Sequence, residues 1–263
     1  MAADLIFLKL GGSLITDKAQ AETALPEVIF RLLSDLKRYL DENPAQKVLV
    51  GHGSGSFGHY AAAQFNTRNG VTTKAEWLGF QQVWESARKL NQIVLDIGKQ
   101  ANLGLISFPP SASLLSRKGQ VASWNTQPLE HAFESGLIPL VYGDVVFDEE
   151  LGGTIFSTEE LFAYLSTILK PGRILLAGRE EAVFADFPIN QQPIKHISCS
   201  SPLESYLQSS QNQDVTGGMR SKVAQMQAIC LANPGTTIEI FHASQPGDLF
   251  NALSGLHSGT IIS

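Results

Sequence analysis

Residues 47–59 read KVLVGHGSGSFGH, an apolar run followed at once by glycines and serines. Residues 5–13, LIFLKLGGS, have the same form near the N-terminus. Apolar runs of this length that end in glycine predict buried strands, here over Leu5–Leu10 and Lys47–Val50. Glycine lets the backbone turn tightly beside a ligand, and a helix that starts there presents the positive end of its dipole. Each turn therefore suits a phosphate group, although a packing turn without a ligand is the alternative for either one alone.

The rest of the chain alternates apolar runs with helical patterns, which is typical of strand–helix units around a mainly parallel sheet. We therefore expect an α/β fold, a single sandwich whose central sheet is flanked by helices. The expected helices are Leu25–Leu40, Ala75–Ala101, Pro128–Ser135, Glu159–Leu169, Val215–Leu231 and Asp248–Leu253. The further strands are Gly104–Phe108, Ile138–Tyr142, Arg173–Ala177, Thr237–His242 and Thr260–Ile262. Turn residues predict a hairpin over residues 143–153, and a polar surface loop is expected over Gln191–Gln213, with part of a helix as the alternative.

The composition excludes several classes of protein. The chain has 263 residues, of which 43% are hydrophobic and 17% charged, as expected for a folded globular domain. A net charge of −6 argues against nucleic acid as a partner, because clustered Lys and Arg would be needed to neutralise its phosphates. No segment approaches 18 uninterrupted apolar residues, and no basic start precedes the first apolar run. We therefore expect no membrane span and no signal peptide, and a cytoplasmic protein.

The two cysteines, Cys199 and Cys230, lack the spacing of a metal site or of a CxxC motif. Isolated cysteines in a chain expected in the cytoplasm favour reduced thiols over a disulfide framework. We expect both to be structural residues with free thiols.

Six motifs occur in order along nearly the whole chain: LKLGGSLITDK, GHGSGSFGH, PLVYGDVVFD, IFSTEE, DVTGGMRSK and a terminal SGT. Together they resemble the amino acid kinase superfamily, and within it the isopentenyl phosphate kinase-like branch, which also holds fosfomycin kinase. Lys-x-Gly-Gly-Ser is shared across the superfamily, whereas ITDK and GSFGH are specific to that branch. The resemblance implies a three-layer αβα sandwich with an acceptor-binding lobe, about 1–170, and a nucleotide-binding lobe, about 171–263.

The resemblance also implies an activity, a cofactor and an assembly state. The activity is ATP-dependent phosphorylation of isopentenyl phosphate to isopentenyl diphosphate, a step of isoprenoid precursor synthesis. The nucleotide carries the Mg2+, and the protein is a homodimer. Two alternatives stay open: a kinase for another small phosphate or phosphonate, similar to fosfomycin kinase, and a non-catalytic ligand-binding homologue with a degenerate nucleotide site.

Phosphoryl transfer needs cations and backbone amides around the moving group, together with the metal ion of the nucleotide. By the resemblance, Lys9 and Lys222 hold the ATP phosphates and Lys18 stabilises the transferred group. A cation at the end of an apolar strand needs a partner, which favours a functional Lys9, whereas a solvated surface residue is the alternative for Lys18 and Lys222. The glycines expected at the nucleotide, the first three as N–H donors, are Gly11, Gly12, Gly55 and Gly218.

His59 is the residue expected to select a phosphorylated acceptor, because an imidazole beside a phosphate dianion can be charged near neutral pH. A helix-start histidine satisfied by the backbone is the alternative. Ser54, Gly58 and Thr158 are the other acceptor-binding candidates by the resemblance. His52 directly follows a strand and is expected to be structural.

The acceptor of this branch has an apolar tail, which needs an apolar pocket. The long helix over Ala75–Ala101 is a plausible wall for that pocket through its side chains Trp77, Phe80, Val83 and Trp84, although core packing is the commoner use of such residues.

Two places depart from the family pattern. Residues 157–159 read Ser-Thr-Glu where the family usually has Ser-Gly-Asp, so a side chain replaces a glycine at the acceptor. On the adenine side the sequence is GREEAVF, with Arg179 and Glu181 in place of two aspartates. Arg179 is the candidate to hold a nucleotide phosphate or a ribose hydroxyl instead. Asp144 and Asp148 could orient a lysine or the hydrated metal, but turn chemistry is their commoner use, and we expect no direct metal ligand.

Overall fold

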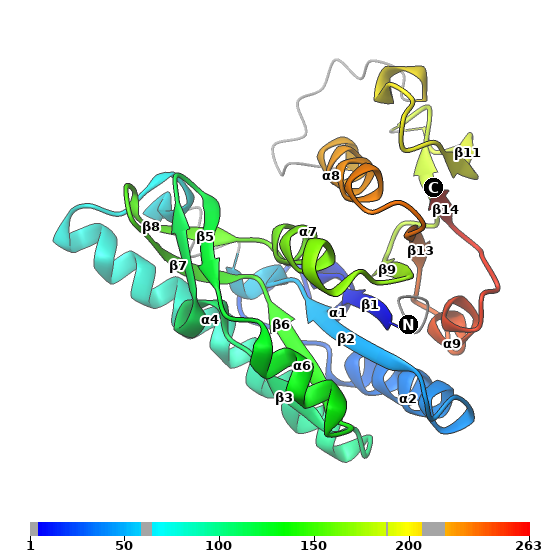
Figure 1. Cartoon of the computed structure of the whole chain (residues 1–263), viewed down its shortest axis with the longest axis horizontal. Helices are drawn as coiled ribbons and strands as arrows, with labels where there is room; N and C mark the ends of the chain where they lie inside the picture. Colours follow the sequence, from blue (N-terminus) through cyan, green and yellow to red (C-terminus); the bar gives the residue numbers. More distant parts are fainter. Residues whose placement is uncertain (1–4, 59–64, 188, 207–218) are drawn as a thin grey trace.

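An eight-stranded sheet forms the centre of the molecule (Figure 1). The computed structural model describes residues 5–58, 65–187, 189–206 and 219–263. Across the sheet the strands are β12 (His196–Ile197), β14 (Thr260–Ile262), β13 (Thr237–His242), β9 (Arg173–Gly178), β1 (Leu5–Leu10), β2 (Lys47–His52), β6 (Ile138–Tyr142) and β3 (Leu105–Ser107). Neighbouring strands are parallel except β13 and β14, which confirms the predicted mainly parallel sheet.

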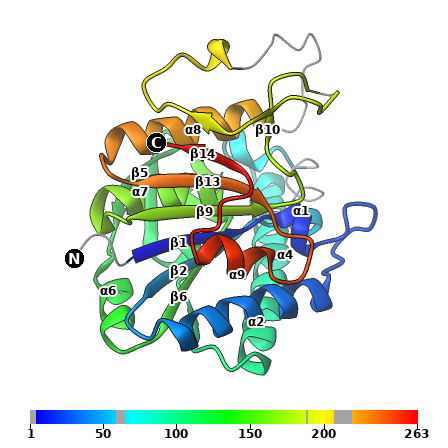
Figure 2. The same cartoon turned by 90° about the vertical axis from the view of Figure 1, so that its right-hand side faces the viewer.

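Helices cover both faces of this sheet (Figure 2). One face carries α2 (Pro26–Glu42), α4 (Lys74–Gln100) and α9 (Asp248–Leu253), and the other carries α6 (Gln127–Glu134), α7 (Thr158–Leu169) and α8 (Met219–Ala232). Strand β1 shows the alternation that two covered faces require: Ile6, Leu8 and Leu10 pack with α2 and α4, whereas Leu5 and Phe7 pack with α7. The predicted sandwich is confirmed, and where the structure describes the ends of predicted helices they agree to within two residues. None of the described helices is long and apolar enough to cross a membrane.

Capping residues decide where two of the helices begin. Thr73 accepts a hydrogen bond from the backbone N–H of Glu76, whose carboxylate accepts one from Thr73 N at 2.8 Å, so α4 begins with a capping box. Ser157 and Glu160 form the same arrangement at α7. The cap places residues 158–159 in the first turn of α7, beside the carboxyl ends of the central strands.

A four-stranded sheet lies beside the central one and has the order β5 (Gln120–Trp124), β4 (Leu114–Arg117), β7 (Asp144–Asp148), β8 (Gly152–Phe156). Strands β7 and β8 are antiparallel and form the hairpin predicted over residues 143–153. The hairpin of β4 and β5 was not predicted, because Ser116, a polar residue, takes an inward position and hides the apolar alternation. Short helical turns complete the chain: α1 (Gly12–Ile15), η2 (Thr67–Asn69), α5 (Pro110–Ser113) and η3 (Leu203–Ser205).

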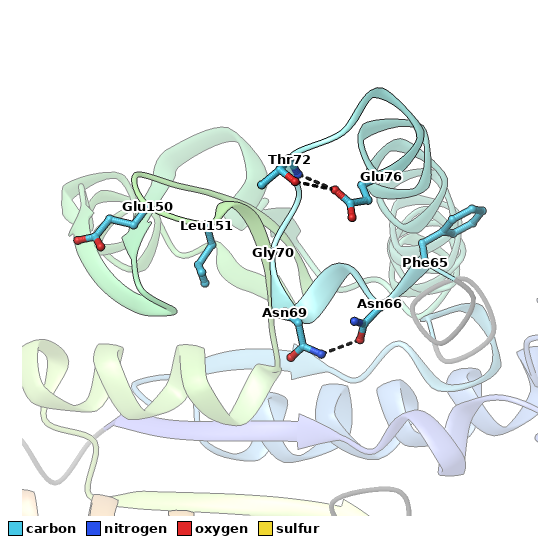
Figure 3. Close-up of a pocket in the computed structure, with 8 residues that line it drawn as sticks. All are labelled: Phe65, Asn66, Asn69, Gly70, Thr72, Glu76, Glu150 and Leu151. Carbon is cyan, nitrogen blue, oxygen red and sulfur yellow. Dashed lines mark hydrogen bonds between the residues drawn. The ribbon is translucent and has the colours of Figure 1, made fainter.

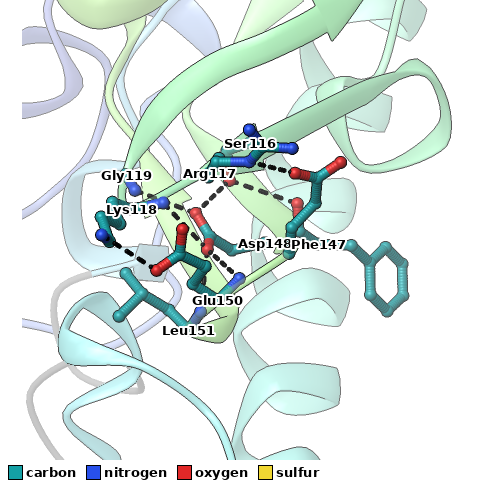
Figure 4. A network of polar contacts seen from close by, with 9 residues as sticks. Ser116, Arg117, Lys118, Gly119, Phe147, Asp148, Glu150 and Leu151 are labelled. Atoms are coloured by element: carbon teal, nitrogen blue, oxygen red, sulfur yellow. Dashed lines mark hydrogen bonds and ion pairs between the residues drawn. The ribbon is translucent and has the colours of Figure 1, made fainter.

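Asp148 joins the two hairpins of this smaller sheet (Figure 4). Its carboxylate accepts hydrogen bonds from the hydroxyl of Ser116 at 2.7 Å and from four backbone N–H groups at 2.8–3.1 Å, those of Lys118, Gly119, Glu150 and Leu151. Burial raises the pKa of this carboxyl, but the donors around it hold the pKa well below its usual range. Turn chemistry, the commoner use considered for Asp148, is therefore confirmed.

The polar segment Gln191–Gln213 is more ordered than the predicted surface loop. β11 (Pro193–Ile194) pairs with β10 (Val183–Phe184), and β12 adds a strand to the edge of the central sheet. Residues 207–213 of the predicted loop lie outside the described residues.

The expectation of two reduced thiols is wrong, because Cys199 and Cys230 form a disulfide. Cys199 follows β12, and Cys230 lies on α8, which covers this edge of the sheet. Their Cα atoms are 5.8 Å apart, within the usual range for a disulfide. A separation of 31 residues along the chain carries no sign of this contact, which arises only when β12 pairs with β14.

Candidate active site

Lys9 lies near the carboxyl end of β1 and forms an ion pair with Glu159 in the first turn of α7. Each side chain is only 11% exposed. Lys9 follows Leu5 and Phe7 in the alternation of β1, so its side chain belongs to the face that α7 covers. A buried ammonium group needs a counter-charge, and Glu159 supplies it. Sequence reasoning expected a partner for Lys9 but did not identify Glu159, although this residue occupies the aspartate position of the family pattern.

Lys222 lies close enough to this pair for the charges of Lys9 and Glu159 to affect its pKa. Burial lowers the pKa of Lys222, and the ammonium groups of Lys9 and Lys18 lower it further, against Glu159 and Glu180. Burial raises the pKa of Glu159, but Lys9 and then Lys222 hold that pKa below its usual value. Three predicted cations are therefore brought together from β1, the loop after α1 and α8. They suit a polyphosphate because like charges repel one another, and among the described residues Glu159 and Glu180 are the carboxylates that act against them at Lys222.

The two glycine-rich turns touch each other through their backbones. A Cβ atom on Gly12 would lie 2.4 Å from the nitrogen of Gly55, and one on Gly53 would lie 2.9 Å from the nitrogen of Gly12. Gly55 has a φ of 49°, which disfavours any side chain. Gly12 begins α1 and Gly55 begins a second helical turn, so both amides belong to first turns, where no intrahelical acceptor exists. Packing thus explains why these residues are glycines, and it also brings two sets of amide donors together.

Gly11 differs from the other two predicted donors. Its N–H donates to the carbonyl of Ala177 at 2.8 Å, and a Cβ atom there would lie 2.7 Å from the same oxygen. The expectation that Gly11 donates to a phosphate is therefore corrected, because its amide joins the turn to β9. Gly218 lies outside the described residues.

The described acceptor-binding candidates lie on two elements, the second glycine-rich turn and α7. Gly58 N donates to Ser54 O at 3.3 Å, and a Cβ atom on Gly58 would lie 2.1 Å from Ser54 Oγ, so these two residues pack together in the second turn. The Thr158 hydroxyl donates to the carbonyl of His52 at 2.6 Å and is fully buried. The side chain of Thr158 is thus used to hold α7 against β2. His59, the residue expected to select the acceptor, lies outside the described residues.

His52 is a buried, neutral imidazole. Its ring stacks on Tyr142 at a centroid distance of 5.3 Å, and its nitrogens lie 3.2 Å from Gly53 O and 3.3 Å from Asn91 Oδ1. Burial lowers the pKa of His52 to about 4, opposed by these two contacts, while the charge of Lys9 lowers it further. The predicted structural role of His52 is confirmed.

Asp144 begins β7, directly after the carboxyl end of β6. It accepts hydrogen bonds from the backbone N–H groups of Val145 at 2.9 Å and Ser111 at 3.3 Å, and burial raises its pKa to about 6. These contacts are turn chemistry, the commoner use considered for this residue. Within the described ranges, no three His, Cys, Asp or Glu side chains are grouped closely enough to hold a metal ion.

The apolar side chains of α4 pack against the β7–β8 hairpin. Trp77, Phe80 and Phe147 form a cluster with centroid distances of 5.2–5.9 Å. Phe80 and Val83 are buried core residues, as the commoner use implies, whereas Phe147 is 48% exposed. The wall expected for an apolar tail therefore reduces to the partly exposed members of this cluster and Trp84.

A pocket of about 230 Å3 lies between the start of α4 and the turn that joins β7 to β8 (Figure 3). Figure 3 shows polar side chains around it, with Thr72 bonded to Glu76 and Asn69 bonded to Asn66. The remaining lining residues are Phe65, Gly70, Glu150 and Leu151. Two carboxylates on its wall make this pocket unsuited to an apolar tail.

Arg179 is an exposed residue that directly follows β9. Glu180 and Glu181 beside it are exposed as well. Of these three, Glu180 acts on the pKa of Lys222. The segment thus brings negative charge towards the cations, and sequence reasoning had not singled out Glu180.

Comparisons with known proteins agree with this geometry. The profile of the amino acid kinase family matches residues 4–241. The isopentenyl phosphate kinase of Methanothermobacter thermautotrophicus is 30% identical over 260 residues, covering 95% of this chain and 96% of the relative. That of Methanocaldococcus jannaschii is 28% identical, covering 98% of each chain. A solved structure of isopentenyl phosphate kinase, 26% identical, superposes with a TM-score of 0.80 over 98% of this chain and 100% of the other.

Proposed function

The chain belongs to the amino acid kinase family, and from this premise we propose that it transfers the γ-phosphoryl group of ATP to isopentenyl phosphate, giving isopentenyl diphosphate and ADP. The observation that carries the proposal is the set of three lysines at two touching glycine-rich turns, with Lys9 buried against Glu159. Two relatives that match this chain over nearly their whole length are named isopentenyl phosphate kinase.

In the proposed reaction an oxygen of the acceptor phosphate attacks the γ-phosphorus, and the bond to the β–γ bridging oxygen breaks as ADP leaves. The acceptor phosphate is already anionic, so no general base is needed. Lys9 and Lys222 would hold the nucleotide phosphates, and Lys18 would stabilise the charge of the transferred group. First-turn amides at Gly12 and Gly55 would add donors without needing to reorganise. Mg2+ would enter with the nucleotide as part of the substrate.

The nucleotide side differs from the rest of the site. Arg179 is exposed, precedes Glu180 in the chain, and is our candidate for a nucleotide phosphate or ribose hydroxyl. Glu180 opposes the cations and would be expected to weaken nucleotide binding. Weak nucleotide binding would be typical of a non-catalytic homologue, but the paired Lys9 and the grouped lysines favour an active kinase.

We further propose a cytoplasmic homodimer that serves isoprenoid precursor synthesis, on the strength of the family pattern and the named relatives. A fosfomycin kinase-like activity is the second candidate for the same site, since it needs the same cations with a different acceptor.

The test is ADP release, coupled to a spectroscopic readout, with MgATP and a panel of acceptors. The panel contains isopentenyl phosphate, isopentenol, a short alkyl phosphate and fosfomycin. We expect turnover with isopentenyl phosphate at least tenfold above the others in kcat/KM, and phosphorus NMR should show a new diphosphate. A rate of ADP release that does not depend on the acceptor, or a preference for fosfomycin, would contradict the proposal.

A further inference from the structure

Lys18 lies in a closed loop between α1 and α2. Thr16 and Ala24 form a bridge at its base, Leu25 N donates to Ile15 O at 2.9 Å, and Asp17 N donates to Thr23 O at 2.9 Å. Lys18 itself is exposed beyond this base. The hydrogen bonds at the base fix where the loop starts and ends, but its orientation over the site needs a further anchor.

Glu22 provides a contact from this loop to α4. Its carboxylate accepts a hydrogen bond from the buried hydroxyl of Ser86 and pairs with Lys89 Nζ at 2.9 Å. The Ser86 and Lys89 contacts, in that order, lower the pKa of Glu22. Its backbone has a φ of 48°, a left-handed conformation that is unfavourable for a residue with a side chain. Such a conformation persists where the surroundings hold it.

The same part of the loop is joined to the second glycine-rich turn through Ser56. Glu22 N donates to Ser56 O at 3.4 Å, and Thr23 N donates to Ser56 Oγ at 3.3 Å. Ser56 N in turn donates to Thr16 Oγ1 at 3.0 Å. The loop that carries Lys18 is therefore fastened to α4 and to the turn that holds Gly55.

We propose that Glu22 is a positioning residue for phosphoryl transfer: its carboxylate, held by Ser86 and Lys89 of α4, orients the loop so that Lys18 faces Lys222 and the transferred group. This inference rests on the proposed function for its kinetic consequence. Its structural consequence, an ordered loop over residues 17–25, does not depend on which acceptor is used. Glu22 touches no reacting group and acts through Lys18.

The first test is hydrogen–deuterium exchange of the intact chain, wild type and Glu22→Ala. We expect the amides of residues 17–25 to exchange about tenfold faster in the variant, and those of β1 and α2 to keep their rates. Glu22→Gly separates the anchor from backbone strain, because glycine accepts the left-handed conformation but lacks the carboxylate. It should loosen the loop as Glu22→Ala does. Unchanged exchange in both variants would overturn the proposal whatever the enzyme catalyses.

The second test is steady-state kinetics. Glu22→Ala should lower kcat by about 10- to 100-fold with the KM for ATP within about twofold, because misplacing one catalytic group costs rate more than binding. Glu22→Gln keeps a hydrogen-bond acceptor for Ser86 and should lose less. Glu42→Ala is the matched control, since Glu42 pairs with Arg38 at 3.2 Å on the solvent-exposed side of α2, and it should behave as wild type.

A double variant distinguishes positioning from general damage to the fold. Added to Lys18→Met, Glu22→Ala should lower kcat by less than about twofold, because there is no longer a lysine to position. An equal effect in both backgrounds would show that Glu22 does not act through Lys18 and would overturn the proposal. A wild-type enzyme without kinase activity would refute the proposed function instead, and the exchange experiment would still decide the role of Glu22.

Discussion

Glu159, in the first turn of α7, is the counter-charge of Lys9 on β1, and both side chains are almost completely removed from solvent. The pair connects a helix to the central strand of the sheet at the point where the glycine-rich turns meet. The charges of Lys9 and Lys18 lower the pKa of the neighbouring Lys222, against Glu159 and Glu180.

Replacing Glu159 with Gln should destabilise the protein by about 3 kcal/mol at pH 7, because it leaves the Lys9 ammonium buried without a counter-charge. MgATP should raise the melting temperature more in this variant than in wild type, since the nucleotide phosphates replace the lost charge. Urea unfolding and thermal shift measure both effects. The exposed Glu42→Gln serves as control, and a loss no larger than in that control would contradict the buried pair.

The same carboxylate predicts a direction for acid unfolding. The pKa of Glu159 is lowered in the folded state, so its stabilising effect is complete above the ordinary value of 4.5 and is lost as the pH falls below it through the folded value. Glu159→Gln removes this dependence, so the stability difference between the two proteins should shrink below pH 4.5.

Replacing Lys18 or Lys222 with Met should lower kcat by on the order of a hundredfold or more while the fold survives. Lys222→Met should also unfold at an equal or higher urea concentration than wild type, because it removes a half-buried ammonium that Lys9 and Lys18 repel. Lys37→Met, which removes a partly exposed ammonium group from α2, is the control. Turnover that is unchanged in either variant would make that lysine a surface residue.

His59 remains the predicted recognition residue for the acceptor phosphate. His59→Ala should lower kcat/KM for the phosphorylated acceptor by about tenfold to over a hundredfold, the effect of losing one charge-assisted hydrogen bond. His59→Gln should lose less because it can still donate. ATP affinity, measured by calorimetry, should hardly change in either variant. Loss of ATP binding with normal acceptor kinetics would contradict this prediction and would place the imidazole on the nucleotide side of the transferred group.

His52 also predicts a pH dependence of stability, but here burial rather than a neighbouring opposite charge lowers the pKa. Its pKa falls from 6.5 to about 4 on folding, so the unfolded chain takes up a proton that the folded one excludes. The stability that His52 permits is complete above pH 6.5 and decreases as the pH falls through the window down to about 4. Between pH 7 and pH 5 the wild type should lose about 2 kcal/mol through this residue.

His52→Gln measures that contribution, because every other titrating group, including Asp144 with its raised pKa, is present in both proteins. Urea unfolding at pH 7 and at pH 5 should show the variant closer to wild type at the lower pH. An equal difference at both values would mean that folding does not change the pKa of His52.

Several local features could be predicted because they depend on short segments. Apolar runs ending in glycine located β1 and β2, and turn residues located the β7–β8 hairpin. Polar inward positions defeated the same reasoning at β4, where Ser116 is buried because it bonds Asp148 from another hairpin. The disulfide of Cys199 and Cys230 was missed for a related reason, since only strand pairing brings the two residues together.

The sequence by itself determined the class of fold, the two glycine-rich turns and the three cations, because periodicity, glycine and charge are properties of local residues. Only the tertiary structure decided how they are used. In the folded chain Lys9 pairs with Glu159, the Gly11 amide donates to β9, and the Thr158 hydroxyl donates to the carbonyl of His52. These contacts join residues far apart in the chain, and burial decides them, since a charge or donor removed from water must find a partner wherever the fold provides one.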